Sequence, residues 1–75
     1  MSAIVYSKPN CIQCVATKRV LDAQGTDYKN IDLSADKNAL ETVIQLGYRE
    51  APVVVVEDKH WSGFRPDLIK QLCAN

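Results

Sequence analysis

The chain has 75 residues, 47% of them hydrophobic, and its nine basic residues balance its nine acidic residues. This length and composition predict one globular domain over residues 1–75 with a thin hydrophobic core. The charge balance gives no electrostatic reason to expect nucleic acid or an anionic membrane surface as a partner.

The N-terminal residues lack the charged region and long apolar run of a signal peptide, and no stretch approaches the roughly 20 apolar residues of a membrane span. We therefore expect a cytoplasmic protein, in a compartment where thiols stay reduced. The three cysteines are an odd number, which fits poorly with a disulfide-stapled secreted fold. Cys11 and Cys14, three residues apart, are thus expected to be catalytic or metal-binding.

The first half of the chain predicts a strand, a helix and a second strand. Residues 3–6 form a short apolar run, typical of a strand buried on both faces. Residues 12–24 are good helix formers, and Gly25 is a natural place for the helix to end. The weak alternation of residues 28–33 indicates an edge strand. The inner face of the first helix is expected to carry Cys14, Thr17 and Leu21.

The second half predicts a helix, two strands and a last helix. Ser34 or Asp36 can cap the second helix. Four consecutive valines at 53–56 predict a central strand, and residues 59–62 return as a short edge strand. Pro66 suits the first position of the last helix. The apolar positions are Leu40, Val43 and Ile44 on the second helix, and Leu68, Ile69, Leu72 and Cys73 on the last.

The predicted order of elements is therefore β-α-β-α-β-β-α. A strand–helix–strand unit has parallel strands joined by a right-handed crossover, and the last two strands form a hairpin. We predict an α/β fold in which one four-stranded mixed sheet is combined with three helices.

Cys11 and Cys14 fall where the first strand hands over to the first helix. Unpaired backbone N–H groups at a helix start stabilise a thiolate, and the pKa of cysteine there falls from about 8.5 to about 7 or lower. Cys11 stands nearest the open end and is the expected nucleophile. Cys14 lies within disulfide distance and faces inward. The pair predicts an exchange in which Cys11 attacks a partner's disulfide and Cys14 resolves the mixed disulfide.

The alternative for these cysteines is a zinc or iron–sulfur site. His60 and Cys73 can complete a four-ligand set with them. Their spacing is not typical of such sites, so we expect redox chemistry and no bound metal. Cys73 alone is interpreted as a small core residue.

Ala51 and Pro52 precede the valine strand. Proline is permitted at the first position of a strand because it donates no ladder hydrogen bond. We expect a cis bond between these residues in this topology. A bend here would bring Ala51 beside the dithiol and leave its backbone free to pair with an extended substrate segment.

Three stretches carry a family resemblance: KPNCIQC at 8–14, APVV at 51–54 and WSGFRPD at 61–67. The pattern resembles the thioredoxin superfold and, more closely, the NrdH-redoxins. These are small proteins with a glutaredoxin-like fold that donate electrons to a bacterial class Ib ribonucleotide reductase. The resemblance covers essentially the whole chain, and WSGFRP is its most specific part. Ile12 stands where the family commonly has valine, which is a conservative change.

Six further residues are expected to contact substrate. Lys8 can steer a partner's acidic tail or help the Cys11 thiolate, although a plain solvated lysine is an equal alternative. Ala51 and Pro52 are expected to receive the substrate backbone. The groove is expected to be completed by Ser62, Gly63 and Phe64. Trp61 is interpreted as a cover for the end of the sheet, and the same role is the alternative for Phe64.

The resemblance also implies partners. Ordinary glutaredoxins usually carry Pro-Tyr between the cysteines and Thr-Val before the proline, where this chain has Ile12-Gln13 and Glu50-Ala51. The glutathione-binding groups are thus only partly present. The resemblance implies re-reduction by thioredoxin reductase with electrons from NADPH, no bound cofactor, and the ribonucleotide reductase large subunit as client. A monomer is expected, and a glutathione-dependent glutaredoxin stays open as the alternative.

Overall fold

The structure is a computed structural model that describes residues 2–72, and it has the predicted order of elements. Cys73, predicted to face inward, lies outside the described residues. No helix within residues 2–72 has the length and apolar character needed to cross a membrane. The elements are β1 (Ser2–Ser7), α1 (Ile12–Ala23), β2 (Asp27–Asp32), α2 (Lys37–Gln45), β3 (Val53–Val56), β4 (Lys59–Ser62) and α3 (Pro66–Gln71).

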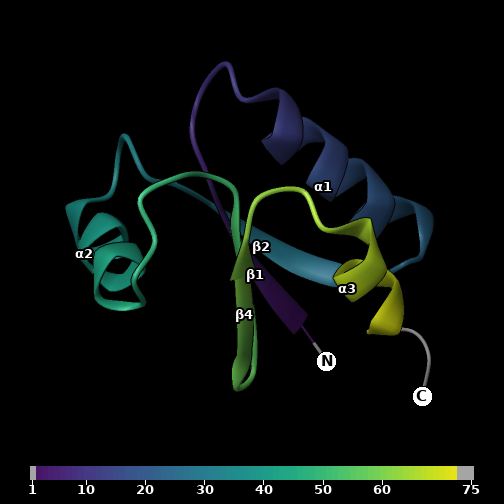
Figure 1. Ribbon diagram of the computed structural model, residues 1–75. Coiled ribbons are helices and arrows are strands. Elements are labelled where there is room, and N and C mark those ends of the chain that lie inside the picture. The colour runs from purple at the N-terminus through teal and green to yellow at the C-terminus, as the bar shows by residue number, and fades with distance from the viewer. Residues whose placement is uncertain (1, 73–75) are drawn as a thin grey trace.

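The four strands form one mixed sheet in the order β2-β1-β3-β4. β1 and β2 are parallel, whereas β3 is antiparallel to both β1 and β4. The valine strand is therefore central, and β2 and β4 are edges, as predicted. In Figure 1, α1 and α3 lie on one side of the sheet and α2 lies on the other.

The face under α1 and α3 holds the larger hydrophobic cluster. Cys14, Thr17 and Leu21 are the buried residues of α1, as predicted from helical spacing. The helix ends at Ala23, and Gly25 follows at φ +74°, a conformation that glycine adopts without steric cost. The cluster consists of Ala3, Val5, Leu21, Val54, Val56, Trp61 and Ile69.

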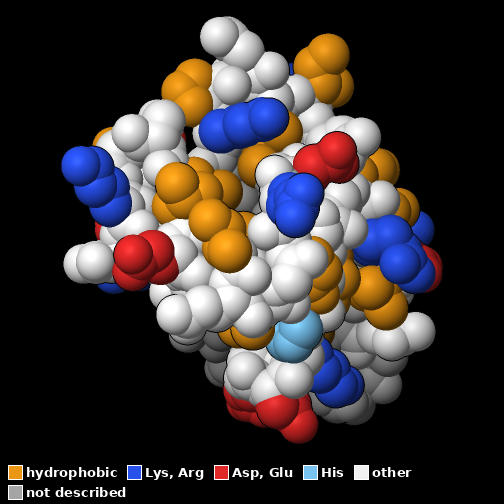
Figure 2. Space-filling view, turned by 60° about the vertical axis from the view of Figure 1, so that its left-hand side comes forward, with side chains coloured by type: hydrophobic (Ala, Val, Ile, Leu, Met, Phe, Trp, Pro, Cys, Tyr) orange, Lys and Arg blue, Asp and Glu red, His pale blue; other side chains and the backbone are white. Residues whose placement is uncertain are grey.

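The face under α2 is less completely covered. Asp36 caps this helix, since its Oδ1 accepts a hydrogen bond from the Ala39 N–H at 3.0 Å. Of the predicted apolar positions, Val43 is buried, but Leu40 is 43% and Ile44 57% exposed. A single nine-residue helix turns only one row of side chains into the sheet, so its flanking apolar residues stay at the surface. Figure 2 shows hydrophobic side chains gathered on this side of the molecule.

Candidate active site

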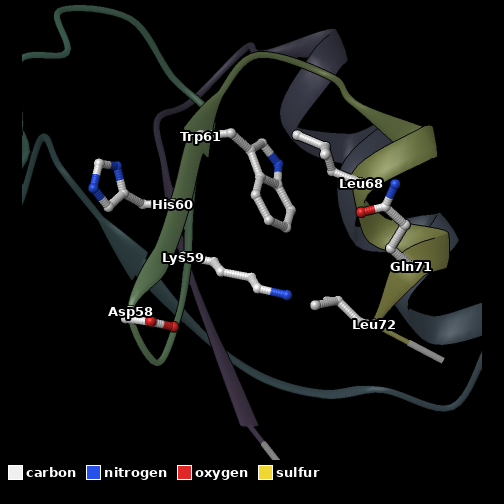
Figure 3. A pocket seen from close by; sticks show the side chains of 7 residues that line it. All are labelled: Asp58, Lys59, His60, Trp61, Leu68, Gln71 and Leu72. Atoms are coloured by element: carbon white, nitrogen blue, oxygen red, sulfur yellow. The ribbon is translucent and has the colours of Figure 1, made fainter. Parts of the chain in front are cut away.

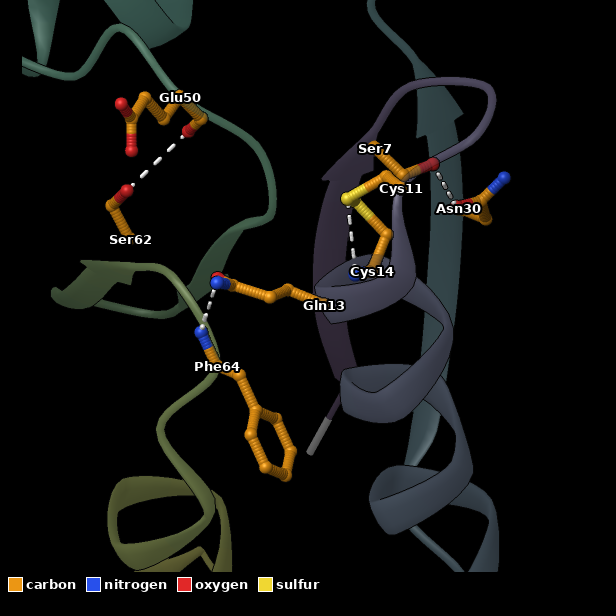
Figure 4. The surroundings of a disulfide bond; sticks show 8 residues. All are labelled: Ser7, Cys11, Gln13, Cys14, Asn30, Glu50, Ser62 and Phe64. Atoms are coloured by element: carbon orange, nitrogen blue, oxygen red, sulfur yellow. Dashed lines mark hydrogen bonds between the residues drawn. A yellow bond between two sulfur atoms is a disulfide. The ribbon is translucent and has the colours of Figure 1, made fainter.

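Cys11 occupies the N-cap position of α1, with extended backbone angles of φ −113° and ψ 103°. Its Sγ accepts a hydrogen bond from the Cys14 backbone N–H at 3.1 Å (Figure 4). This is the bond that a serine or aspartate oxygen usually makes at an N-cap. The sulfur of Cys11 thus sits at the positive end of the helix, as the sequence predicts.

The two cysteines are joined by a disulfide, with their Cα atoms 5.2 Å apart. Their exposures differ, because Cys14 is 2% exposed on the inner face of α1 whereas Cys11 is partly exposed at its tip. Cys11 is therefore the more accessible of the two residues to a sulfur of another molecule. The first turn of α1 contains no acidic residue, so no carboxylate there opposes a negative charge on sulfur.

The backbone conformation of Asn10 and a hydrogen bond of Ser7 stabilise the loop before Cys11. Asn10 has φ +59°, in the left-handed region that asparagine tolerates better than most residues. Ser7, at the end of β1, is 4% exposed, and its hydroxyl donates a hydrogen bond to Asn30 Oδ1 at 2.7 Å (Figure 4). This bond ties the ends of β1 and β2 together beneath the dithiol.

An open cavity of about 610 Å³ lies beside the two cysteines. The structure brings Lys8 into its lining, together with Lys18 from α1. Hydrogen bonds from Ser34 lower the pKa of Asp32, and the charge of Lys18 lowers it further. The complete lining is Lys8, Pro9, Asn10, Cys11, Ile12, Cys14, Val15 and Lys18.

The cavity lining described above forms one wall of the site. The segments around Pro52 and Gly63 form a second wall. The Ala51–Pro52 bond is cis, as expected. Tyr6 pairs with Val53, so Pro52 lies beside the end of β1, where the cysteine loop departs. Hydrogen bonds join the two segments: the Gly63 N–H donates to Pro52 O at 2.8 Å, and the Ser62 hydroxyl donates to Glu50 O at 3.3 Å.

The side chain of Gln13 links the first turn of α1, which carries the two cysteines, to this wall. Its Oε1 accepts a hydrogen bond from the Phe64 N–H at 3.3 Å, and Figure 4 shows the side chain spanning the space between the two segments. Gly63 has φ +84°, and a Cβ there would come within 3.7 Å of Gln13 Oε1. Sequence reasoning missed this role, because only the fold brings residues 13 and 64 together.

Phe64 lines a neighbouring groove instead of the cavity beside the cysteines. The groove has a volume of about 480 Å³, and Ile12 and Val15 also line it. Ile12 is 87% exposed and Phe64 is 37% exposed. The predicted substrate-contacting residues are thus divided, with Lys8 on one side of the dithiol and the other five on the second wall or beside it.

The interpretation of Trp61 as a cover for the sheet agrees with the structure. Trp61 is 7% exposed within the core cluster, and Figure 3 shows it on the side of β4 that faces α3, near Leu68. His60 points to the opposite side, where its Nδ1 lies 2.7 Å from the Tyr48 hydroxyl. Within residues 2–72, no three His, Cys, Asp or Glu side chains are placed to hold a metal ion together.

Comparisons with known proteins agree with this geometry. The glutaredoxin family model matches residues 3–61. The glutaredoxin-like protein NrdH of Salmonella typhimurium is 40% identical over 72 residues, which are 96% of this chain and 89% of that protein. NrdH of Lactococcus lactis subsp. cremoris is 38% identical over 68 residues, which are 91% of this chain and 94% of that protein.

Among solved structures, the glutaredoxin-like protein NrdH-redoxin from Escherichia coli matches with a TM-score of 0.92 at 40% identity. The match covers 96% of this chain and 95% of that one. The fold, the Cys-x-x-Cys pair and its disulfide are those of a redoxin. The chain therefore belongs to the glutaredoxin family, as a thiol–disulfide oxidoreductase of the NrdH glutaredoxin-like group.

Proposed function

We propose that the chain is a dithiol electron donor for protein disulfides, with Cys11 as nucleophile and Cys14 as resolving thiol. The observation that carries the proposal is the difference between two sulfurs within one helical turn. Cys11 is partly exposed and accepts a backbone hydrogen bond at the start of α1, whereas Cys14 is 2% exposed. Only Cys11 is open to a second disulfide, and only Cys14 is positioned to displace what Cys11 has bound.

The reaction transfers two electrons to the client. The Cys11 thiolate attacks one sulfur of the client disulfide, so that a Cys11–client bond forms, the client S–S bond breaks, and the released client sulfur takes a proton. Cys14 then loses its proton and attacks Cys11 Sγ. The Cys11–Cys14 disulfide forms, the second client sulfur leaves as a thiolate and is protonated, and the protein is left oxidised.

The client segment is proposed to lie between the two walls of the site. Lys8 and Lys18 provide positive charge on the side of the cavity, which favours acidic residues next to the client disulfide. Ala51 and Pro52 are proposed to present backbone groups to an extended segment, and Ser62, Gly63 and Phe64 to complete this surface. The hydrogen bonds from Ser62 and Gly63 to the neighbouring segment support such a preformed surface.

The proposed client is the large subunit of a class Ib ribonucleotide reductase, through its C-terminal cysteines. Thioredoxin reductase is proposed to restore the dithiol with electrons from NADPH, without a cofactor bound to this chain. The thioredoxin-like activity profile of the Escherichia coli relative supports this reductase. We further propose that the chain acts as a single-domain monomer in the cytoplasm.

A coupled assay with NADPH, thioredoxin reductase and a protein disulfide tests the proposal. The wild type should sustain NADPH oxidation, and Cys11→Ser should abolish it because no nucleophile remains. Cys14→Ser should accumulate the mixed disulfide, visible as a client adduct by mass spectrometry. Replacing the general substrate by the ribonucleotide reductase large subunit tests the proposed client.

A parallel arm supplies glutathione as the reductant. If glutathione reduces the oxidised protein and thioredoxin reductase does not, the chain is a glutathione-dependent glutaredoxin and the proposed reductase is wrong. Metal analysis and a visible spectrum of freshly prepared protein test the zinc and iron–sulfur alternatives. A stoichiometric metal bound through Cys11 and Cys14 would overturn the redox assignment.

A further inference from the structure

Thr17 carries a buried hydroxyl one helical turn after Cys14. The residue is 0% exposed, and its Oγ1 has no hydrogen-bond partner among the described residues. Thr42 on α2 shows the usual alternative, since its hydroxyl donates to the Asn38 carbonyl four residues earlier at 3.0 Å. Burying a hydroxyl without a partner costs free energy, because its hydrogen bonds to water are lost and not replaced. An unpaired group beside a redox centre calls for a functional explanation.

The geometry of α1 places the Thr17 side chain on the same face as the resolving cysteine. Cys14 and Thr17 are three residues apart on the inner face of the helix, and both are buried. Cα–Cβ bonds in a helix tilt toward its N-terminus, so the side chain of Thr17 leans toward the turn that carries Cys14. Figure 4 shows Cys14 in the first turn of α1, with its sulfur bonded to Cys11.

We propose that Thr17 is a positioning residue for Cys14, and that its hydroxyl donates a hydrogen bond to the Cys14 sulfur whenever the Cys11–Cys14 disulfide is open. The inference rests on the proposed dithiol exchange and assigns a role that the exchange itself does not require. In the disulfide form that the structure shows, the Thr17 hydroxyl makes no hydrogen bond to the Cys14 sulfur or to any other described group. In the dithiol and the mixed disulfide, the sulfur can become a thiolate, which is a much stronger acceptor.

Thr17 acts on the second chemical step without taking part in bond exchange. When Cys14 loses its proton and attacks Cys11 Sγ, the client sulfur leaves with the electron pair and takes up a proton. The threonine hydroxyl keeps its own proton throughout. It stabilises the Cys14 thiolate in a place where water cannot, since Cys14 is 2% exposed.

The proposal fixes the sign of a thermodynamic effect. If the hydroxyl stabilises the open forms and is unpaired in the disulfide, removing it favours the disulfide. Thr17→Val removes the hydroxyl at nearly constant shape, and Thr17→Ser keeps it. In a dithiothreitol redox buffer, Thr17→Val should shift the equilibrium constant about tenfold toward the disulfide, which equals about 30 mV for a two-electron couple. Thr17→Ser should stay close to the wild type.

A kinetic readout follows the resolving step itself. In a Cys73→Ser background, reduced protein attacks 5,5′-dithiobis(2-nitrobenzoate) through Cys11 and releases one thionitrobenzoate, and Cys14 then attacks the mixed disulfide and releases the second. The pH dependence of this second release should move to higher pH in Thr17→Val, because the pKa of Cys14 rises when its donor is removed. The first release, made by Cys11, should keep its rate.

Thermal unfolding of the oxidised proteins separates this role from a structural one. Oxidised Thr17→Val should unfold at the same temperature as the wild type or higher, because the lost hydroxyl had no partner. Thr17→Ala, which also lacks the hydroxyl, should shift the redox equilibrium in the same direction as Thr17→Val. The proposal is overturned if the valine variant leaves both the equilibrium and the pH profile unchanged, or if Thr17→Ser behaves like Thr17→Val. These measurements contain no reductase or client, so they stand apart from the choice of partners.

Discussion

The face of the sheet under α1 and α3 buries Leu21, Val54 and Ile69 completely, whereas α2 contributes only two buried residues of its own, Ala39 and Val43, to the other face. The first face also carries the dithiol, because Cys14 belongs to the same inner row of α1 as Leu21. The second face leaves Leu40 and Ile44 at the surface. The two reactive cysteines therefore lie on the face of the sheet that holds the larger buried cluster.

This difference shows how a small domain can hold a reactive turn steady. Cys11 is the N-cap of α1, and the inner face of this helix packs into the core through Leu21. The packing of the helix therefore fixes the position of the Cys11 sulfur. α2 contributes instead through the loop that leads to Ala51 and Pro52. Changes under α2 should therefore alter stability and leave the dithiol chemistry largely intact.

The strongest way to test the comparison uses two neighbours in β3. Val53 and Val54 are both 0% exposed and belong to the clusters under α2 and under α1 and α3, respectively. Changing either to alanine removes two methylene equivalents and should cost about 2 kcal/mol of unfolding free energy. Val54→Ala should cost more than Val53→Ala. Two helices pack on the face that contains Val54, and they can move less easily to fill the cavity that the substitution leaves. Urea denaturation measures both, and a larger loss for Val53→Ala would contradict the proposed difference.

A smaller effect is expected at the start of α2. Asp36→Ala removes the oxygen that accepts from the Ala39 N–H and should cost about 1 kcal/mol of stability. Turnover in the coupled assay should be unchanged at temperatures where the variant is folded. Asp36→Asn is the matched control, because it keeps a capping oxygen. A large fall in turnover for folded Asp36→Ala would show that α2 positions the dithiol after all.

The smallest effect concerns the exposed ion pair at the start of α3. The hydrogen bonds from Arg65, at 2.9 Å and 3.2 Å, lower the pKa of Asp67. A carboxylate with a depressed pKa adds stability above its unfolded value of about 4, and this is lost as the pH falls through the folded value. Asp67→Asn should therefore show a shallower loss of stability below about pH 4 than the wild type. If the unfolding free energies of the wild type and Asp67→Asn fall equally with decreasing pH, the ion pair contributes nothing to stability.

Much of the fold could be predicted because local patterns and global topology agree. Four successive valines suit only a strand buried on both faces, and β3 is central. The spacing of Cys14, Thr17 and Leu21 identified the inner face of α1. The exposure of Ile44 could not be predicted, because helical spacing defines an apolar stripe but not the width of the surface that covers it.

The candidate site was predictable where its chemistry is local and not where it depends on the fold. Cys11 and Cys14 are neighbours in sequence, and their helix-start position follows from the element order. Gln13 meets Phe64 across 51 positions, and no local pattern connects them. The unpaired hydroxyl of Thr17 likewise appears only when every neighbouring acceptor has been placed.

The central claim is that Cys11, and not Cys14, presents a reactive thiolate to the outside. The most direct test is to alkylate the reduced protein with iodoacetamide across pH 6 to 9 and to map the modified cysteines by mass spectrometry, with Cys73 counted separately. The account predicts that Cys11 reacts first and already at neutral pH, whereas Cys14 reacts slowly. Modification of Cys14 at least as fast as Cys11, or a Cys11 that stays unmodified until well above pH 8, would contradict it.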